Sequence, residues 1–210
     1  MRIKSKNTIK FILKAIGIIL IVIWGVIIIG IPIILTSSVG GSDTTSTADG
    51  FTIQEYKVYL DVLENNKVNV TEDITVDWYN TNHHGILKFI PEWLEYTDKN
   101  GNTIKRKANI KDLKSSSDTY SVDTVNGKAR IKLGNVNYYV DSGLKTYSTS
   151  YLYDMGKDPY RGFDEFIFHT FGDYWGTSIK NASIEVKMPK SIEGMNINFF
   201  TDKYRKNNVN

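Results

Sequence analysis

Two adjacent histidines, His83 and His84, are the first side chains in this sequence whose type could support metal binding or acid–base chemistry. Neighbouring side chains on an extended segment point to opposite faces, so the two rings cannot easily bind one metal ion. The same geometry separates the carboxylates of Glu72 and Asp73, whereas general acid–base catalysis needs groups that converge. These pairs therefore predict no catalytic residue, no metal site and no cofactor.

The aromatic residues gathered between positions 138 and 175 are a second candidate, because exposed rings can bind sugars or peptides. Tyr147, Tyr151 and Tyr153 are separated by even numbers of residues, so they share one face of a strand. Large side chains on a shared face are more typical of a sandwich core than of a ligand surface. We therefore expect most of these rings to be buried.

Composition and charge exclude several classes of function. The chain has 210 residues and no cysteine, which excludes thiol catalysis, disulfides and zinc sites built on thiolates. Residues 1–14 carry five basic residues and no acidic one, while the rest carries 21 basic and 23 acidic residues. A nucleic-acid partner is not expected, because the basic residues beyond position 14 are offset by acidic ones.

Residues 15–35 are 21 consecutive positions without a charge. A helix of this length is about 31 Å long and matches the hydrocarbon core of a bilayer, its expected partner. The basic flank predicts a cytoplasmic head at 1–14 and an extracytoplasmic remainder, on a protein that crosses the cell membrane once. A cleaved secretory signal is the alternative. The Ser, Thr and Gly content of residues 36–50 indicates a flexible stalk.

From residue 51 onward, apolar residues recur with the period of two that is typical of strands. Runs at 56–63 and 68–78 flank a short loop and predict a β-hairpin. A second hairpin is predicted around Asn126-Gly127, which supplies the two positive-φ residues of a type I′ turn.

The expected fold is all-β: an immunoglobulin-like antiparallel β-sandwich at 51–201, preceded by one N-terminal transmembrane helix and followed by a polar tail at 202–210. Further strands are expected at 103–110, 144–153, 163–171, 182–188 and 195–201. The predicted core consists of Val58, Leu60, Val70, Ile74, Val76, Trp78, Ile86, Ile90, Leu152, Phe166, Phe168, Trp175, Ile184 and Val186.

Two places depart from simple alternation. Glu72 occupies an inward position by parity, so either a β-bulge resets the register or its carboxylate is paired. Residues 93–102, WLEYTDKNGN, predict one helical turn followed by a loop around Asn100-Gly101.

The stretch His84-Gly85-Ile86, followed by Ile90-Pro91, resembles the "HGI…IP" signature of the domain-of-unknown-function 2207 family (DUF2207) of predicted bacterial membrane proteins. The resemblance covers about residues 51–200. It extends to YKVYLDVLENNKVNVTEDITVDW, with its "V-T-E-x-I" strand, to LKTYSTSYLYD, and to DEFIFHTFGDYWGTSIKNASIEVKMP, where Gly172, Trp175, Ile179 and Pro189 match.

This resemblance implies an extracytoplasmic β-sandwich and supplies no activity, so no catalytic residue is carried over. The sequence departs from the family pattern where Phe168 replaces a tryptophan and where the basic residue, Lys88, lies one position earlier. Family members usually continue into further transmembrane helices, so we expect either a fragment or a short form with a single anchor.

The segment from His84 to Pro91 has two interpretations. In the structural one, Gly85 permits a close approach, Pro91 fixes the chain and the neighbouring isoleucines plug the apolar end of the sandwich. In the functional one, His84 and Lys88 present a recognition edge. The side chains of His84 and Lys88 are expected to be solvated in the structural interpretation too. The residue types favour the structural interpretation.

The function expected first is a non-enzymatic extracytoplasmic module that senses, scaffolds or contacts other membrane or cell-envelope proteins. The alternative is an envelope hydrolase or glycan-binding module that uses the aromatic-rich half, with Asp164, Glu165, His169 or Asp173 as its polar groups. A cleft that gathered two of these carboxylates with a histidine would favour the enzyme.

Overall fold

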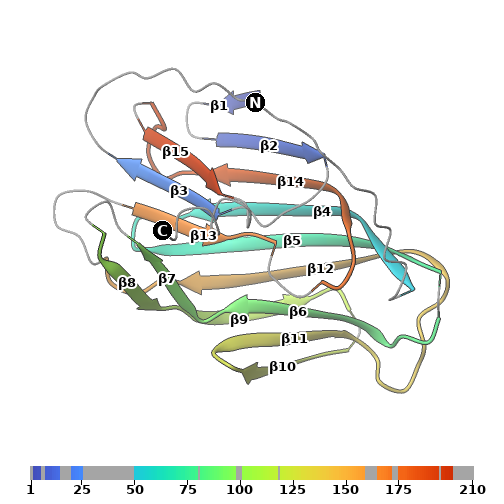
Figure 1. The fold of residues 1–210 in the computed structure, drawn as a ribbon. Helices are drawn as coiled ribbons and strands as arrows, with labels where there is room; N and C mark the ends of the chain where they lie inside the picture. Colours follow the sequence, from blue (N-terminus) through green and yellow to red (C-terminus); the bar gives the residue numbers. More distant parts are fainter. Residues whose placement is uncertain are drawn as a thin grey trace.

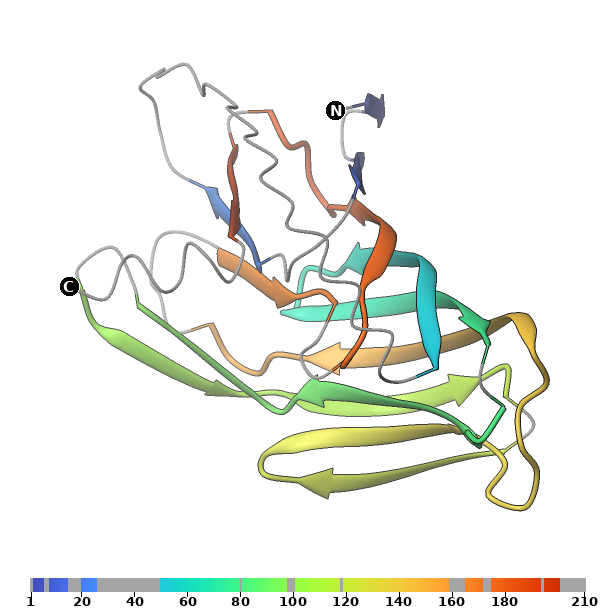
Figure 2. The same ribbon diagram turned by 45° about the vertical axis from the view of Figure 1, so that its right-hand side comes forward.

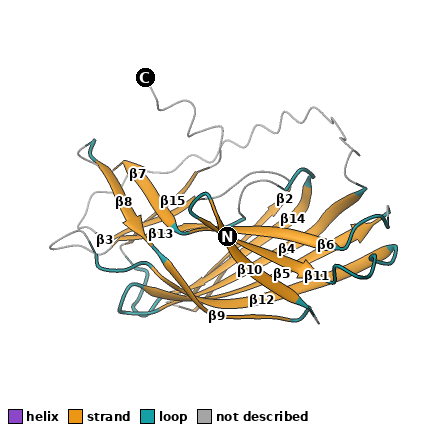
Figure 3. Ribbon diagram, turned by 90° about the horizontal axis from the view of Figure 1, so that it is seen from below, coloured by secondary structure: helices purple, strands orange, loops and turns teal. Residues whose placement is uncertain are grey.

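The computed structural model describes residues 2–5, 8–14, 20–25, 50–79, 81–97, 101–117, 119–158, 165–171, 175–193 and 195–200. Every regular element in these ranges is a strand, which confirms the predicted all-β class (Figure 3). The strands are β1 (Arg2–Ser5), β2 (Thr8–Lys14), β3 (Leu20–Gly25), β4 (Phe51–Val62), β5 (Lys67–Trp78), β6 (Gly85–Pro91), β7 (Trp93–Thr97), β8 (Thr103–Lys107), β9 (Asn109–Ser115), β10 (Tyr120–Val125), β11 (Lys128–Gly134), β12 (Gly143–Asp154), β13 (Glu165–His169), β14 (Ile179–Lys187) and β15 (Met195–Phe200).

The described strands form one large sheet and three small ones. The large sheet has the order β1-β2-β14-β4-β5-β12-β9, and the small sheets are β10-β11-β6, β13-β3-β15 and β7-β8. Neighbours in these sheets are antiparallel, apart from the parallel pair of β14 and β4. Figures 1 and 2 show the sheet β10-β11-β6 along one side of the large sheet, with β10 at the lower edge of the molecule.

The core is built from the large sheet and from buried residues of β6, β11, β7 and β13. Side chains alternate between buried and accessible along β5 and β6, as the sequence predicts for strands with one covered face. Twelve of the fourteen predicted core residues are buried: Val58, Leu60, Val70, Ile74, Val76, Trp78, Ile86, Ile90, Phe166, Phe168, Ile184 and Val186.

The other two predicted core residues are not fully buried. Leu152 is half-buried, because its neighbours Tyr151 and Tyr153 on β12 point inward and a strand alternates its faces. Trp175 is partly buried and packs against the rim of the core. The alternation of faces along β12 is enough to show that the prediction of Leu152 as a core residue is wrong.

Both predicted hairpins are present. β4 pairs with β5, and β10 pairs with β11. At the second hairpin, Asn126 and Gly127 have φ angles of 52° and 70°, which is the positive-φ pair of a type I′ turn. The helical turn expected after residue 93 is wrong, since Trp93–Thr97 is strand β7, paired with β8.

The N-terminal strands differ from the sequence prediction. β2 pairs with β14, and β3 lies between β13 and β15, so the described part of the segment 15–35 is extended rather than helical. Isoleucine, valine and tryptophan favour strands wherever a sheet edge offers backbone partners. The prediction of a helix depends on lipid, where the backbone must satisfy its own hydrogen bonds.

The remainder of the expected span, residues 15–19 and 26–35, lies outside the described residues, and the span stays a prediction. The same holds for residues 36–49 of the expected stalk and for the tail at 202–210. Within the described residues no helix has the length and apolar content needed to cross a membrane.

Two facing glycines set the distance between β6 and β11. Gly85 lies opposite Gly134, with φ angles of 140° and 139°. A Cβ on Gly85 would lie 1.9 Å from the carbonyl oxygen of Leu133, and one on Gly134 would lie 2.0 Å from that of His84. Glycine is therefore required at both positions, and this supports the structural interpretation of the motif.

We predict that Gly85→Ala lowers the free energy of unfolding by at least about 1 kcal/mol, because it adds a backbone clash to an unfavourable φ. Gly143→Ala is the matched control, since Gly143 also has a positive φ, 105°, but no atom lies within 4 Å of its added Cβ. Denaturant unfolding of the two full-length variants measures the difference. An equal loss in both variants would contradict the close-packing argument.

Candidate functional site

The most unusual polar group in the described core is an ion pair between the two layers. Lys88 on β6 pairs with Glu72 on β5, and their side chains are 3% and 0% exposed. The two residues come from different sheets, so the contact joins the layers. An ion pair at this depth must recover the cost of removing two charges from water.

Hydroxyl groups on the large sheet complete the cluster. The Nζ of Lys88 donates to the hydroxyl of Tyr56 on β4 at 2.9 Å. The hydroxyls of Thr149 and Tyr151 on β12 each donate to one carboxylate oxygen of Glu72 at 3.3 Å. Both charges are therefore hydrogen-bonded as well as paired, which is the condition under which a buried pair can be tolerated.

The tyrosines of this cluster remain protonated at neutral pH. Burial raises the pKa of the Tyr56 hydroxyl well above its usual 10.0, and the negative charge of Glu72 raises it further. Burial and then the charge of Glu72 raise the pKa of Tyr151 in the same way. The Tyr151 hydroxyl therefore keeps the proton that it donates to the carboxylate, and the cluster contains one cation and one anion.

This cluster decides between the two alternatives that the sequence left for Glu72. Its carboxylate is paired, and the ladder between β5 and β12 is regular from Lys67 to Trp78. The prediction that Lys88 is solvated is wrong. Lys88 has the parity of Ile86 and Ile90, both of which were predicted to be buried, and this signal could have found it.

The family-like stretch DEFIFHTFGDYWGTSIKNASIEVKMP also contacts this cluster, through the ring of Tyr56. The rings of Phe171 and Trp175 contact the Tyr56 ring at centroid distances of 5.0 and 5.8 Å, both edge-on. The indole Nε1 of Trp175 donates to the carbonyl oxygen of Phe171 at 2.6 Å. Of the predicted motif residues, Gly172 lies outside the described residues.

The two histidines diverge, as predicted for adjacent residues on an extended segment. The ring of His83 packs against Trp78 at 5.2 Å, on the core side. The ring of His84 stacks on Tyr139 at 4.4 Å, and its Nδ1 lies 2.9 Å from the carbonyl oxygen of Tyr138. His84 therefore holds the loop that follows β11.

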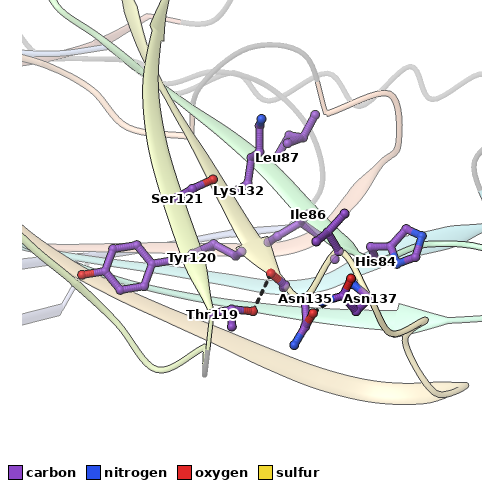
Figure 4. Close-up of a pocket in the computed structure, with 13 residues that line it drawn as sticks. His84, Ile86, Leu87, Thr119, Tyr120, Ser121, Lys132, Asn135 and Asn137 are labelled. Atoms are coloured by element: carbon purple, nitrogen blue, oxygen red, sulfur yellow. Dashed lines mark hydrogen bonds between the residues drawn. The ribbon is translucent and has the colours of Figure 1, made fainter.

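An open cleft of about 500 Å³ lies beside His84 (Figure 4). Its walls are residues 84–87 at the start of β6, 119–121 at the start of β10, and 132–137 from β11 and the following loop. Tyr138 and Tyr139 follow the lining residues in the same loop and are 70% and 64% exposed, and the Tyr139 ring stacks on His84, which lines the cleft.

The polar groups of this cleft are mainly uncharged. Thr119, Ser121, Asn135 and Asn137 supply hydroxyls and amides, and the ammonium of Lys132 is the one side-chain charge among the lining residues. No carboxylate is among the described residues that line it. The cleft can therefore offer hydrogen bonds and aromatic surface to a ligand, and its described lining residues include no paired acid and base.

The other candidate residues do not gather in the cleft. Asp73 points to the outer face of the large sheet, where it accepts a hydrogen bond from the Ser148 hydroxyl at 2.5 Å. His169 lies on β13. Asp164, Asp173 and the side chain of Glu165 lie outside the described residues. Within the described part, no group of three or more potential ligands could hold a metal ion.

The aromatic run divides into two sets. Tyr147, Tyr151 and Tyr153 are buried, as predicted for core packing. Tyr138 and Tyr139, the first two rings of the run, are exposed beside His84 instead. Both lie in the loop between β11 and β12, so the alternation that places the other rings does not apply to them.

Comparison with known proteins confirms the family resemblance. The family model described as "Predicted membrane protein (DUF2207) N-terminal domain" matches residues 52–210 of this chain. No curated protein matches the sequence. Among solved structures, the M1 zinc metallopeptidase from Deinococcus radiodurans is 11% identical with a TM-score of 0.29, over 50% of this chain and 20% of its own. Native yeast LTA4 hydrolase is 8% identical with a TM-score of 0.31, over 49% of this chain and 14% of its own. The chain thus spans a fifth or less of these two proteins.

We predict that Lys88→Met lowers the free energy of unfolding by about 3–5 kcal/mol, because it leaves the Glu72 carboxylate buried without its cation. The double variant Lys88→Met/Glu72→Leu should recover most of this loss, since it removes both charges. Urea unfolding of the full chain measures both changes.

The matched control for this prediction is Lys132→Met on the neighbouring strand, whose side chain is 48% exposed. Lys132→Met should lower the free energy of unfolding by less than about 1 kcal/mol. If Lys88→Met had as small an effect as this control, Lys88 would be solvated and the ion pair would be excluded.

Proposed function

Since the chain belongs to the DUF2207 family of predicted membrane proteins, we propose that it is a membrane-anchored extracytoplasmic module. In this proposal residues 15–35 cross the bilayer once, the β-domain lies outside the cytoplasm, and the cleft at His84 binds another protein of the membrane or cell envelope. The two-layer arrangement of strands supports an immunoglobulin-like assignment, which we include in the proposal.

The anchor has a structural consequence. In a bilayer, the segment that contains β3 becomes a helix, because lipid offers its backbone no other hydrogen-bond partners. β2 then separates from β14, and β3 separates from β13 and β15. The small sheet β10-β11-β6 and strands β4, β5 and β12 are paired without β2 or β3, so the cleft does not depend on them.

The cleft carries the functional part of the proposal. Tyrosine, asparagine, serine and glycine are the residues that protein-binding loops use most, because tyrosine gives rigid contact area and the small polar residues adapt their hydrogen bonds. The corner at His84 combines these types, with Tyr138 and Tyr139 exposed and Asn135 and Asn137 in the wall. This composition, without a lining carboxylate, favours binding over hydrolysis.

A glycan-binding role is the second candidate, because the two exposed tyrosine rings could also stack on sugars. Lys132 is the one charged side chain among the described lining residues, and a single cation does not select a polypeptide over a glycan. The hydrolase alternative takes last place, because the carboxylates that it would need are not among the described cleft residues. The protein partner takes first place because of the residue types at the corner of His84.

We predict that a cysteine at Leu144, which is 70% exposed, reacts with a membrane-impermeant thiol reagent on intact cells or protoplasts. A cysteine at Ser5, in the expected cytoplasmic head, should react only after permeabilisation. The natural chain has no cysteine, so each variant has a single reactive site. Labelling of both positions from outside would contradict the anchor.

We predict that a photoreactive phenylalanine analogue at Tyr139 forms a discrete adduct with a second protein in intact cells. The same analogue at Tyr59, which is exposed on the outer face of the large sheet, is the matched control and should give none. The Tyr138→Ala substitution should reduce the Tyr139 adduct. If the purified chain instead bound isolated envelope glycan, and Tyr139→Ala abolished that binding, the glycan alternative would replace the protein partner.

A further inference from the structure

Strand β10 is an edge strand with little cover. It pairs with β11 on one side, and no other described strand pairs with it. All its residues from Tyr120 to Thr124 are exposed. Figures 1 and 2 show it at the lower edge of the molecule, with no described element beyond it.

The turn that precedes β11 determines which backbone groups face this free edge. A two-residue type I′ turn is closed by a hydrogen-bonded pair, here Val125 and Lys128. Hydrogen-bonded residues alternate along an antiparallel pair, and the Gly134 amide donates to the carbonyl oxygen of Thr119, as this alternation requires. The N–H and C=O groups of the residues between, Tyr120, Val122 and Thr124, therefore point away from β11.

The side chains of the same three residues are exposed along this edge, and two of them have polar partners: the Tyr120 hydroxyl donates to the carbonyl oxygen of Leu113 on β9 at 3.1 Å, and the Thr124 hydroxyl donates to Glu92 at 3.2 Å. The three residues have the parity of the inward residues of β11 but are less covered, since Tyr120 is 42% exposed and Val122 is 48% exposed. An uncovered edge with apolar side chains is a template for another strand, and soluble proteins usually protect such edges with charge or proline.

The charge on this edge is already neutralised. Asp123, on the opposite face of β10, is paired within its own sheet, since the Nε of Arg130 donates to it at 2.7 Å and the Nζ of Lys132 lies 3.6 Å away. These contacts lower the pKa of Asp123, with the hydrogen bond from Arg130 as the largest cause. The one acidic residue of β10 is thus a weaker barrier to strand pairing than an unpaired carboxylate would be.

We propose that β10 pairs antiparallel with β10 of a second copy of this chain, about a two-fold axis at Val122. In this register Val122 faces Val122 of the second copy, and Tyr120 faces its Thr124. All three residues with edge-facing backbone groups then form hydrogen bonds to the second copy. The joint, meaning the paired β10 strands, therefore contains three hydrogen-bonded pairs of residues. The result is a continuous sheet in the order β6-β11-β10-β10-β11-β6.

Two observations favour a second copy in this register. The two-fold symmetry makes the strand its own complement, with Ser121 opposite Asp123 of the second copy, so the serine hydroxyl can donate to that carboxylate. A register centred on Asp123 would place two carboxylates directly opposite, which is destabilising, and would pair fewer backbone groups. Other symmetric registers also use fewer of the three edge-facing residues.

The joint also reaches the cleft. Ser121 lines the cleft, so Asp123 of the second copy would lie beside the β10 wall of the first. The dimer would thus bring a second Asp123 carboxylate toward each cleft, in addition to that of the same chain, which lies 3.6 Å from the Nζ of the lining residue Lys132. The dimer itself does not depend on the proposed protein partner, and either proposal can fail alone.

The test uses single cysteines in the full-length chain, in isolated membranes, with mild oxidation. Hydrogen-bonded antiparallel residues have Cα atoms about 5.5 Å apart, within the range of a disulfide. Val122→Cys should therefore give a covalent dimer. Thr124→Cys alone should not, because its two copies are about 14 Å apart along the strand. A mixture of Tyr120→Cys and Thr124→Cys should again cross-link.

Val136→Cys is the exposure control, since Val136 is 79% exposed and lies outside β10. Cross-linking at Val136 as efficient as at Val122, or equal cross-linking at Val122 and Thr124, would overturn the proposed joint. The absence of any covalent dimer from Val122→Cys would also overturn it.

A second measurement uses Val122→Pro, which removes an edge-facing N–H without breaking the ladder to β11. In sedimentation of the detergent-solubilised chain, the natural protein should be a dimer and Val122→Pro a monomer with unchanged melting temperature. Val122→Lys, a charged edge residue, should have the same effect and replaces the proline variant if that variant unfolds. A natural chain that sediments as a monomer, or variants that remain dimeric, would contradict the proposal.

Discussion

The ion pair of Lys88 and Glu72 constrains the whole β-domain, because neither charge can be buried unless four strands meet in one arrangement. β6 supplies the cation, β5 the anion, and β4 and β12 the hydroxyls that complete their hydrogen bonds. A slip of one residue in β6 would turn Lys88 outward and Phe89 inward, and would leave the carboxylate of Glu72 alone in the core. The pair therefore specifies register between two layers that apolar contacts alone would leave free to shift.

The glycine pair of Gly85 and Gly134 imposes a second constraint, at the start of β6 and the end of β11. Because no side chain separates β6 from β11 at this point, the two strands approach closely and the loop after β11 returns alongside His83 and His84. His84 then stacks on Tyr139, which keeps that ring at the surface. The family-like motif thus has two physical roles within eight residues: Lys88 joins the layers, and His84 and Gly85 shape the cleft.

The N-terminal segment illustrates how solvent decides secondary structure. Its isoleucines and valines can extend along the edges of β13 and β14, where backbone partners exist, or form a helix in lipid, where none do. Membership in a family of predicted membrane proteins supports the second environment. The same physical argument applies to β10, whose free backbone groups and apolar side chains we assign to a second copy of the chain rather than to water.

The sequence by itself determined the features that depend on neighbouring residues. Alternation predicted the strands and most of the core, Asn126-Gly127 predicted the turn of the second hairpin, and parity placed Glu72 inward and sent His83 and His84 to opposite sides. Only the tertiary structure showed that Lys88 is the partner of Glu72, that Tyr139 stacks on a histidine of the cleft, and that β10 is an edge strand with exposed side chains. These last features depend on which sheet covers which, and the packing between sheets joins residues that are distant in sequence and leave no local pattern in it.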